Sequence, residues 1–444
     1  KVHPQTDGNQ TSGKIVRFEL PSNTLLNLRG TRLFFNAVTA GAGTSMPNDV
    51  SSFIERCSVY MGGVLVQNGF QGYNVLKHAK AALVGSKCGS TLGHPEIVRK
   101  VSYHNGATFG NTDPEAYSTD GTEAFCIDNF EGLLGSLEPG IIDSGLFPQI
   151  TLEITLADDT VCPISEGRIM PDGAGSSTNN FDKAGSGNPT YVLSQMTLQC
   201  EVLGMATSVL DQIVEQRIAS VGYLSMPFKN YYSFVSTHAG TSRFNVNSAS
   251  WDRLWLAYRP TNYSTKSAPV IVNGYKKAGF FGDDTAGQTA ADVDIGLPQY
   301  DSGGSGLLGT NCERYISNYF KFKEIESSAS VPAYFQLQVN SANIPAYRMT
   351  TPEAYAMSMN AVDTYDKNSK MTLDQYRNDF FVQCYRFCLP DSDFNRLASG
   401  LDTRSVSAMG SLTTENIASC NLMMFAECTA ELRLGAGRAI EIIA

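Results

Sequence analysis

The sequence predicts an all-β protein built from two successive β-domains of similar plan. Between Ile150 and Leu156, apolar residues alternate with Thr or Glu, the pattern of a strand with one buried face. The same alternation returns from Met424 to Leu434, late in the second half of the chain. The composition agrees, because 40 Gly and only 17% charged residues, against about 25% in average proteins, favour many turns and surfaces hidden against other subunits.

The 444 residues are enough for two or three domains with a sizeable core. We predict a polar N-terminal arm at 1–13, a first β-domain at 14–205, a connecting helix at 206–219 and a second β-domain at 220–444. The apolar stripe from Val209 to Ile218 is the reason for the connecting helix.

The first half contains strand patterns joined by turns and one helix. A strand–turn–strand unit at 54–69 turns at Gly62-Gly63 and is followed by a helix at about 75–83. Two polar, Gly-rich stretches, 86–122 and 164–190, are expected to form exposed loops. Further strands are predicted at 14–20, 31–38, 125–130, 150–157 and 192–203.

The second half repeats this order. A strand–turn–strand unit at 334–347 runs into a helix, for which we expect Thr351 as N-cap and Pro352 in the first turn. A long Gly-, Asp- and Ser-rich loop is predicted at 260–311. Strands are also predicted at 223–235, 242–247, 253–259, 319–325, 380–389, 421–434 and 438–443, and short helices at 372–379 and 392–400.

The charge and hydropathy of the chain exclude several functions. A net charge of −10 and a pI near 5.1, without a Lys/Arg run, argue against non-specific binding of nucleic acid, and direct sequence-specific binding is not predicted either. No apolar run reaches 18 residues, so no transmembrane helix is predicted, and the start carries no signal-peptide pattern. The chain begins at Lys1 rather than Met, which leaves open whether an N-terminal piece is removed.

Four stretches carry a resemblance to a known family. They are IERCSVYMGGVLVQNG at 54–69, LGSLEPGIIDSGLFPQITLEITLADD at 134–159, FQLQVNSANIPAY at 335–347 and AECTAELRLGAGRAIEI at 426–442. The chain resembles the double jelly-roll major capsid proteins of icosahedral double-stranded DNA viruses, above all those of polinton-like viruses and virophages. The resemblance implies two tandem eight-stranded jelly rolls, homotrimeric pseudo-hexagonal capsomers, contacts with neighbouring capsomers and with penton and minor capsid proteins, and a place in the virion after assembly inside the host cell. The family has no catalytic residues to carry over.

The residues themselves predict no metal site and no cofactor. Five histidines (His3, His78, His94, His104 and His238) form no pair at ligand spacing. Asp283, Asp284, Asp292 and Asp294 lack the order of an EF-hand, so a solvated acidic loop explains them. Phosphate-binding glycine motifs are absent.

No catalytic residue is predicted either. The DSGG at 301–304 is similar to the nucleophile segment of chymotrypsin-like proteases, but Tyr300 stands where that family has Gly and no matching histidine segment exists. The ten cysteines form no CxxC pair and are expected to be free thiols. Cys384 and Cys388 on one strand would be about 13 Å apart, too far for a disulfide.

The sequence therefore predicts a structural protein, a viral major capsid subunit, and not an enzyme. The alternative from another class is an extracellular carbohydrate-binding or glycan-degrading β-sandwich protein with tyrosines as sugar platforms. A third hypothesis is a minor or penton capsid protein, but the tandem duplication favours the subunit of a pseudo-hexagonal capsomer. Virus, host, lattice size and membrane contact are left open.

Overall fold

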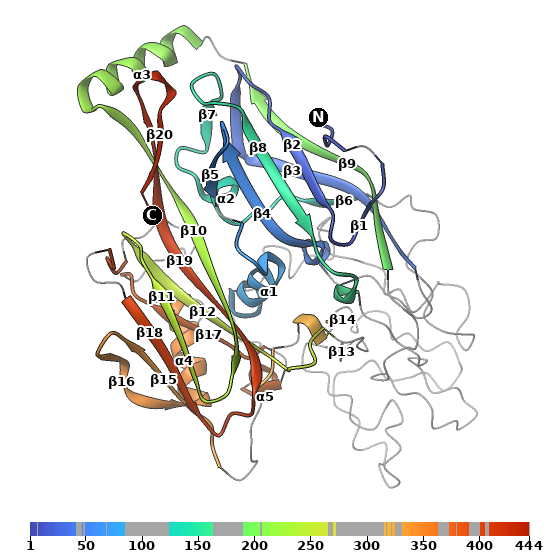
Figure 1. Cartoon of the computed structure of the whole chain (residues 1–444), viewed down its shortest axis with the longest axis vertical. Coiled ribbons are helices and arrows are strands. Elements are labelled where there is room, and N and C mark those ends of the chain that lie inside the picture. Colours follow the sequence, from blue (N-terminus) through green and yellow to red (C-terminus); the bar gives the residue numbers. More distant parts are fainter. Residues whose placement is uncertain are drawn as a thin grey trace.

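The protein is described here by a computed structural model, in which two β-sandwiches lie side by side (Figure 1). The structure describes residues 1–6, 8–40, 47, 49–67, 69–84, 124–162, 190–204, 207–264, 270–271, 315–316, 318–320, 322–324, 331–362, 373–378, 380–389, 400–404 and 408–443. The predicted loops 86–122 and 164–190, most of the predicted loop 260–311 and the predicted helix 392–400 lie outside these residues, apart from single residues or short pieces at their edges.

The N-terminal half forms two antiparallel sheets. One sheet has the order β1-β9-β3-β6, with β7 also paired to β3, and the other has the order β2-β8-β4-β5. The strands are β1 (Gln10–Thr11), β2 (Ile15–Glu19), β3 (Leu25–Ala40), β4 (Ile54–Met61), β5 (Val64–Gln67), β6 (Ala124–Ile127), β7 (Ile141–Asp143), β8 (Ile150–Leu156) and β9 (Thr190–Leu203). Helices α1 (Tyr73–Val84) and α2 (Leu133–Ser136) lie between β5 and β7.

The C-terminal half repeats this plan after the connecting helix α3 (Thr207–Val221). Its sheets have the orders β10-β19-β12-β17, with β20 also paired to β19, and β11-β18-β15-β16. The strands are β10 (Tyr223–His238), β11 (Thr241–Val246), β12 (Trp251–Arg259), β15 (Tyr334–Val339), β16 (Ala342–Thr350), β17 (Val382–Arg386), β18 (Ala408–Glu415), β19 (Cys420–Gly435) and β20 (Ile440–Ile443). Helices α4 (Thr351–Ala361) and α5 (Leu373–Asn378) follow β16, and β13 (Val270–Ile271) pairs with β14 (Tyr315–Ile316).

The strand order shows that each half is a jelly roll. If β7, β13, β14 and β20 are set aside, each half has eight described strands. In both halves the first, eighth, third and sixth strands form one sheet, and the second, seventh, fourth and fifth form the other. This arrangement of eight antiparallel strands in two sheets is the jelly roll. In both halves a helix, α1 or α4, follows the fifth strand, as the repeated strand–turn–strand–helix pattern predicts.

The predicted domain boundaries stay a prediction, but the sheets show how the ends of the first half are used. Within residues 1–13, Val2 bridges Leu198 and β1 pairs with β9, so parts of the predicted arm extend the first roll. The predicted connecting helix at 206–219 corresponds to α3, which lies at the top of Figure 1, where β10 begins and β19 turns into β20.

Two local predictions are wrong. The described residues of 319–325 do not form a strand: Asn318–Phe320 is a 3-10 helix, and Phe322 makes an isolated bridge to Phe380. Both aromatic rings are buried: Tyr319 packs on Tyr263, and Phe320 packs on His78. The apolar pattern of this stretch therefore comes from side-chain packing and not from the pairing of strands. The N-cap of α4 is Thr350, not Thr351, because Glu353 stands three residues after Thr350 and closes a capping box with it.

Strand β18 was not predicted, because Ala408–Glu415 has no clear apolar alternation. It nevertheless joins β11 to β15. Gly410 lies opposite Phe244, and a Cβ atom at Gly410 would overlap the Phe244 ring. The bare glycine leaves room for that ring, which packs edge-on against Trp251 at 6.2 Å between centroids.

We expect Gly410→Ala to destabilise the protein by about 1–3 kcal/mol, because the Phe244 ring must leave its place in the core. Chemical denaturation followed by tryptophan fluorescence measures this loss. Gly204→Ala is the matched control, since a Cβ atom there meets no atom within 4 Å, and it should change stability by less than about 0.5 kcal/mol. Equal stability of the two variants would contradict the role of Gly410.

Candidate functional site at the junction of the two jelly rolls

The two rolls share one continuous core through a junction built around α1. Helix α1 contacts β4 of its own roll and β12, β17 and α4 of the second roll. The hydrophobic cluster of buried residues runs without a break from Val16 in the first roll to Leu434 in the second. At its centre, the ring of Phe70 lies 5.4 Å from that of Tyr231 and 6.0 Å from that of Phe425, both in the second roll. The junction therefore has the aromatic anchor expected of a permanent interface.

Beside this anchor, the outer face of the β10-β19-β12 sheet carries charged residues. Lys229 is opposite Thr429, and Tyr231 is opposite Glu427, so these four side chains share one face. A register shift in β12 between Trp251 and Arg253 marks a bulge, and a bulge re-aims the side chains around it. It brings Asp252 and Arg253, neighbours in the sequence, to bond Lys229 and Glu427 respectively.

These residues form a buried cluster of four charges, which we call the junction cluster: Lys229, Asp252, Arg253 and Glu427. Lys229 Nζ lies 2.8 Å from Asp252 Oδ2 and 3.5 Å from Glu427 Oε1. Arg253 Nη1 lies 3.2 Å from Glu427 Oε1, and Trp255 Nε1 donates to Glu427 Oε2 at 2.9 Å. The side chains of Lys229, Asp252, Arg253 and Glu427 are 4%, 0%, 0% and 1% exposed. Two cations and two carboxylates are therefore held out of solvent.

The two carboxylates of the junction cluster differ in acidity. Burial raises the pKa of Glu427, but its attraction to Lys229, Arg253 and Lys80 outweighs that effect and holds the pKa at about 2. Burial also raises the pKa of Asp252, and there Lys229 and the hydroxyls of Thr429 and Ser250 offset it only in part. Attraction to both carboxylates outweighs burial and raises the pKa of Lys229.

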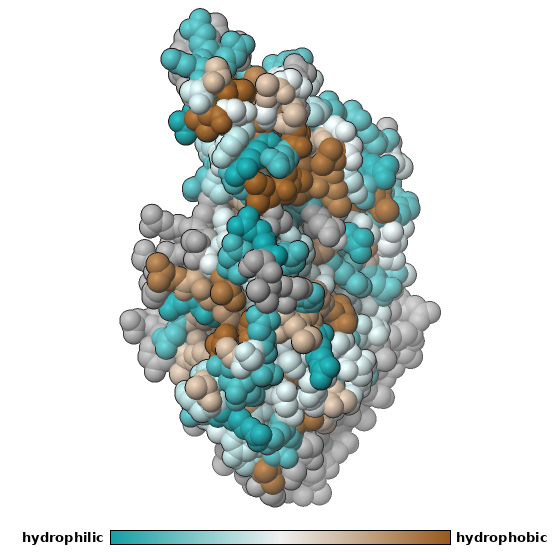
Figure 2. Space-filling view, turned by 60° about the vertical axis from the view of Figure 1, so that its left-hand side comes forward, coloured by the Kyte–Doolittle hydropathy of each residue, from teal (hydrophilic) through white to brown (hydrophobic). Residues whose placement is uncertain are grey.

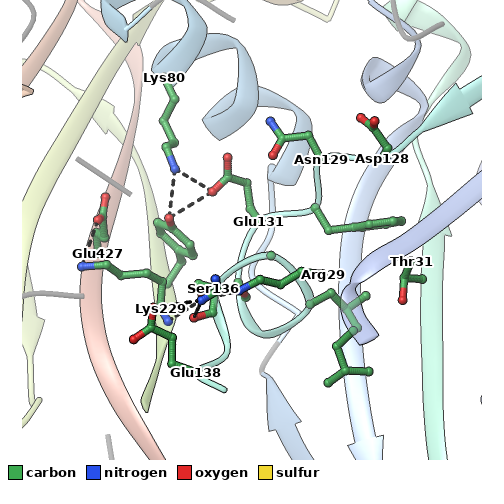
Figure 3. Close-up of a pocket in the computed structure, with 16 residues that line it drawn as sticks. Arg29, Thr31, Lys80, Asp128, Asn129, Glu131, Ser136, Glu138, Lys229 and Glu427 are labelled. Atoms are coloured by element: carbon green, nitrogen blue, oxygen red, sulfur yellow. Dashed lines mark hydrogen bonds and ion pairs between the residues drawn. The ribbon is translucent and has the colours of Figure 1, made fainter. Parts of the chain in front are cut away.

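The first roll covers the junction cluster with α1 and α2. Lys80 of α1 donates to Glu131 at 2.6 Å and to the Tyr231 hydroxyl of the second roll at 3.1 Å (Figure 3). Ser136 of α2 accepts the Lys229 amide at 2.7 Å, and the Glu138 amide donates to the Pro227 carbonyl at 3.0 Å. A cavity of about 390 Å³ lies between these elements and is lined by residues of both rolls, including Arg29, Lys80, Lys229 and Glu427.

Buried polar contacts hold the turn before α2 in place. Gly132 has φ of +84°, and a Cβ atom there would lie 2.6 Å from the Gln67 carboxamide. Gln67 accepts the Leu133 amide at 2.8 Å, and the Tyr73 hydroxyl accepts the Glu131 amide at 2.8 Å. Gly132, Gln67 and Tyr73 therefore fix the backbone that holds Glu131 beside α1.

A second polar contact between the rolls involves Glu55 of β4. Its carboxylate accepts from the Tyr319 hydroxyl at 3.3 Å and from the Gly72 amide at 3.2 Å. Burial raises the pKa of Glu55, although Tyr319 and Arg259 oppose this. The Arg259 guanidinium stacks on the Tyr263 ring at 3.8 Å, so the aromatic residues of the second roll shield the charges at this contact.

The structure places three of the predicted candidate histidines. His3 is exposed, and His78 stacks on Phe320 of the second roll at 3.9 Å, where burial lowers its pKa to about 4. His238 joins the two sheets of the second roll through Ser242 and Thr414, each at 2.7 Å. Among the described residues, no group of three or more His, Cys, Asp or Glu could hold a metal ion. The absence of a metal site stays a prediction for the whole chain.

The remaining candidates are divided between described and undescribed segments. The DSGG at 301–304, the four aspartates from Asp283 to Asp294, His94 and His104 lie outside the described residues. Cys384, Cys388 and the six other described cysteines are free thiols, as predicted. No helix within the described part of the chain is both long and apolar enough to cross a membrane.

The junction cluster was not predicted from the sequence. Its residues are spread from position 229 to position 427, and only the unusual charges inside apolar strands, such as Glu427 among Met424 to Leu434, could have indicated it.

Comparisons with known proteins find similarity only among solved structures. No family model matches the chain, and no curated protein matches it. Solved structures do: the chain is similar to the capsid of the virus PBCV-1 (12% identity, 99% of this chain and 95% of that one, TM-score 0.47). It is also similar to the Faustovirus major capsid protein, at 8% identity over 97% of this chain and 89% of that one, with a TM-score of 0.45. The mavirus major capsid protein is similar at 10% identity over 99% of this chain and 89% of that one, with a TM-score of 0.44. The fold is a double jelly roll. The strand order of the two halves carries this assignment, and the fold predicted from the sequence is confirmed.

We expect Glu427→Gln to destabilise the protein by about 3–5 kcal/mol at pH 6, because Arg253 stays buried without the carboxylate that it pairs with. The folded pKa of Glu427 lies below its ordinary value of 4.5, so its contribution is present above pH 4.5 and is lost as the pH falls toward 2. The difference between wild type and variant should therefore shrink between pH 6 and pH 3.

Urea unfolding at both pH values measures this difference. Comparing the two proteins at each pH removes the ordinary titration of groups such as Glu55, which are common to both. Glu415→Gln, which breaks the exposed pair with Arg348, is the control and should cost less than about 1 kcal/mol at either pH. A Glu427→Gln effect as small as that of the control, or one that grows toward pH 3, would contradict the account.

Proposed function

We propose that the chain is the major capsid subunit of an icosahedral virus, a structural protein without enzymatic activity that acts in the virion. The observation that carries this proposal is the tandem repeat of one strand order on a single chain. Jelly rolls are building units of viral capsids. Two similar rolls held in one rigid unit give each subunit two similar outer edges, so three subunits close a ring of six rolls. The similar solved structures are those of a viral capsid and of viral major capsid proteins.

The surface near α3 supports contacts between subunits. Figure 2 shows apolar side chains gathered on the face below α3. Val221 of α3, Val202 of β9 and Ile141 of β7 are 45%, 49% and 48% exposed. Apolar patches exposed on a surface, such as the one in Figure 2, mark interaction surfaces. We propose that this end takes part in contacts between subunits or with other capsid proteins.

The opposite end is proposed to face outward. Ala40 of β3 pairs with Thr190 of β9, and β6 begins at Ala124 opposite Asn36, so the segment after residue 40 and the segments that end before residues 124 and 190 connect to this end of the sheet. The other end of the same strands, where Leu25 pairs with Leu203, leads to α3. The predicted exposed loops 86–122 and 164–190 therefore each re-enter the first roll at the end away from α3.

The alternative function, a carbohydrate-binding or glycan-degrading protein, receives no support from the junction. A glycosidase needs two carboxyl groups free to act as acid and base. Asp252 is paired with Lys229, Glu427 with Arg253, and Glu131 with Lys80.

We expect the purified protein to be a homotrimer with a pseudo-hexagonal outline. Light scattering with size-exclusion chromatography should give three times the chain mass of 48.1 kDa at micromolar concentration, and electron microscopy should show six-lobed particles. A permanent interface of this kind commonly buries more than about 2,000 Å². A well-behaved monomer across the micromolar range, or particles with three widely separated lobes, would contradict the proposed function.

A further inference from the structure

Three residues of the junction cluster lie in positions suited to a covalent bond. Lys229 of β10 and Asp252 of β12 stand on either side of β19, which carries Glu427. Lys229 Nζ is 2.8 Å from Asp252 Oδ2, one carbon–oxygen bond away from Asp252 Cγ, and 3.5 Å from Glu427 Oε1. An amine, a carboxyl carbon and a proton-accepting carboxylate are thus held together within a sheet, without the freedom to separate.

We propose that Lys229 and Asp252 condense to an intramolecular isopeptide bond, with Glu427 as the group that moves the proton. This proposal concerns a modification site in the second roll and does not depend on the capsid function.

The surroundings of Asp252 favour attack at its carboxyl carbon. Ser250 Oγ donates to Asp252 Oδ1 at 2.8 Å, and Thr429 Oγ1 donates to Asp252 Oδ2 at 2.6 Å. Donors fixed on both oxygens withdraw electrons from Cγ and stabilise the oxyanion that forms when the amine adds. Burial, which raises the pKa of Asp252, favours the protonated carboxyl that condensation requires.

The step balances in atoms and charge. The Lys229 ammonium passes one proton to Asp252 Oδ2, and the resulting amine attacks Cγ to form the nitrogen–carbon bond. The nitrogen of this adduct is far more acidic than the starting ammonium, so Glu427 can take its second proton despite being a weak base. Glu427 then delivers that proton to Oδ2, the Cγ–Oδ2 bond breaks, and one water leaves. No oxidant, reductant or cofactor is needed.

The products suit the site better than the reactants. Two buried charges, which are costly to keep from water, are replaced by a neutral amide. Arg253 and Glu427 remain as a balanced pair at 3.2 Å. Lys229 and Glu427 both line the 390 Å³ cavity at the junction, so the water that is released has space to leave. Position within the fold supplies the effective concentration that free lysine and aspartate lack.

The bond would tie the first strand of the second roll to the third, across the last. These strands are not hydrogen-bonded to each other, since β19 lies between them. Residues 229 to 252 would become a closed loop that unfolding cannot open, which limits the unfolded chain as a disulfide does.

The intact mass of the purified wild-type chain under denaturing, reducing conditions is the direct test. We expect a mass 18 Da below that of the sequence, and a tryptic digest in which the peptide containing Lys229 is joined to the peptide containing Asp252. Lys229→Arg removes the attacking amine and should restore the full mass, and Glu427→Gln should slow or abolish the loss of water.

Lys80 with Glu131 provides a comparison inside the same chain. This lysine is also paired with a carboxylate at 2.6 Å and donates to the Tyr231 hydroxyl at 3.1 Å, but the Glu131 side chain is 13% exposed, whereas that of Asp252 is 0% exposed. We expect a loss of 18 Da and not 36, with the Lys80 peptide linear. A wild-type chain of full mass with a linear Lys229 peptide, or a cross-link at Lys80 instead, would overturn the proposal whether or not the variants fold.

Discussion

The structure depends on covering one charged sheet face. The outer face of the β10-β19-β12 sheet carries Lys229, Asp252, Arg253 and Glu427, and in a single jelly roll this face would meet solvent. Here α1 and α2 of the first roll lie over it, so the charges are buried and must satisfy one another. Removing any one of them leaves an uncompensated charge, and for this reason the second roll is adapted to the presence of the first.

This dependence explains how a tandem repeat can behave as one unit. The chain connection through α3 lies at one end of the molecule, away from the junction around α1, so it does not set the angle between the rolls there (Figure 1). The orientation is fixed instead by side-chain contacts: the Phe70 ring between Tyr231 and Phe425, Lys80 on Tyr231, and Glu55 on Tyr319. A fixed angle between the rolls is what a subunit needs if it is to occupy two positions of a six-lobed ring.

The sequence was informative wherever local pattern determines structure. In strands such as Ile150–Leu156, apolar and polar residues alternate because one face is buried. Gly62-Gly63 could be recognised as the turn between β4 and β5 because the turn needs positive φ at both residues, which glycine adopts readily. Strand Ala408–Glu415 was missed because its pairing is decided by its neighbours, and Phe244 supplies the apolar surface that Gly410 lacks. The junction cluster could not be predicted, since it depends on a bulge at Asp252 and on strands that are distant in sequence.

Hydrogen exchange at the junction tests the central claim, that the two rolls form one rigid unit. The Glu138 amide donates to Pro227 and the Lys229 amide to Ser136, so both are protected only while the rolls stay together. The account predicts that peptides covering 131–139 and 226–231 exchange as slowly as the core strands β8 and β12 in the purified protein. Rapid exchange of the amides of Glu138 and Lys229, with both sandwiches still protected, would show that the rolls separate and would contradict the account.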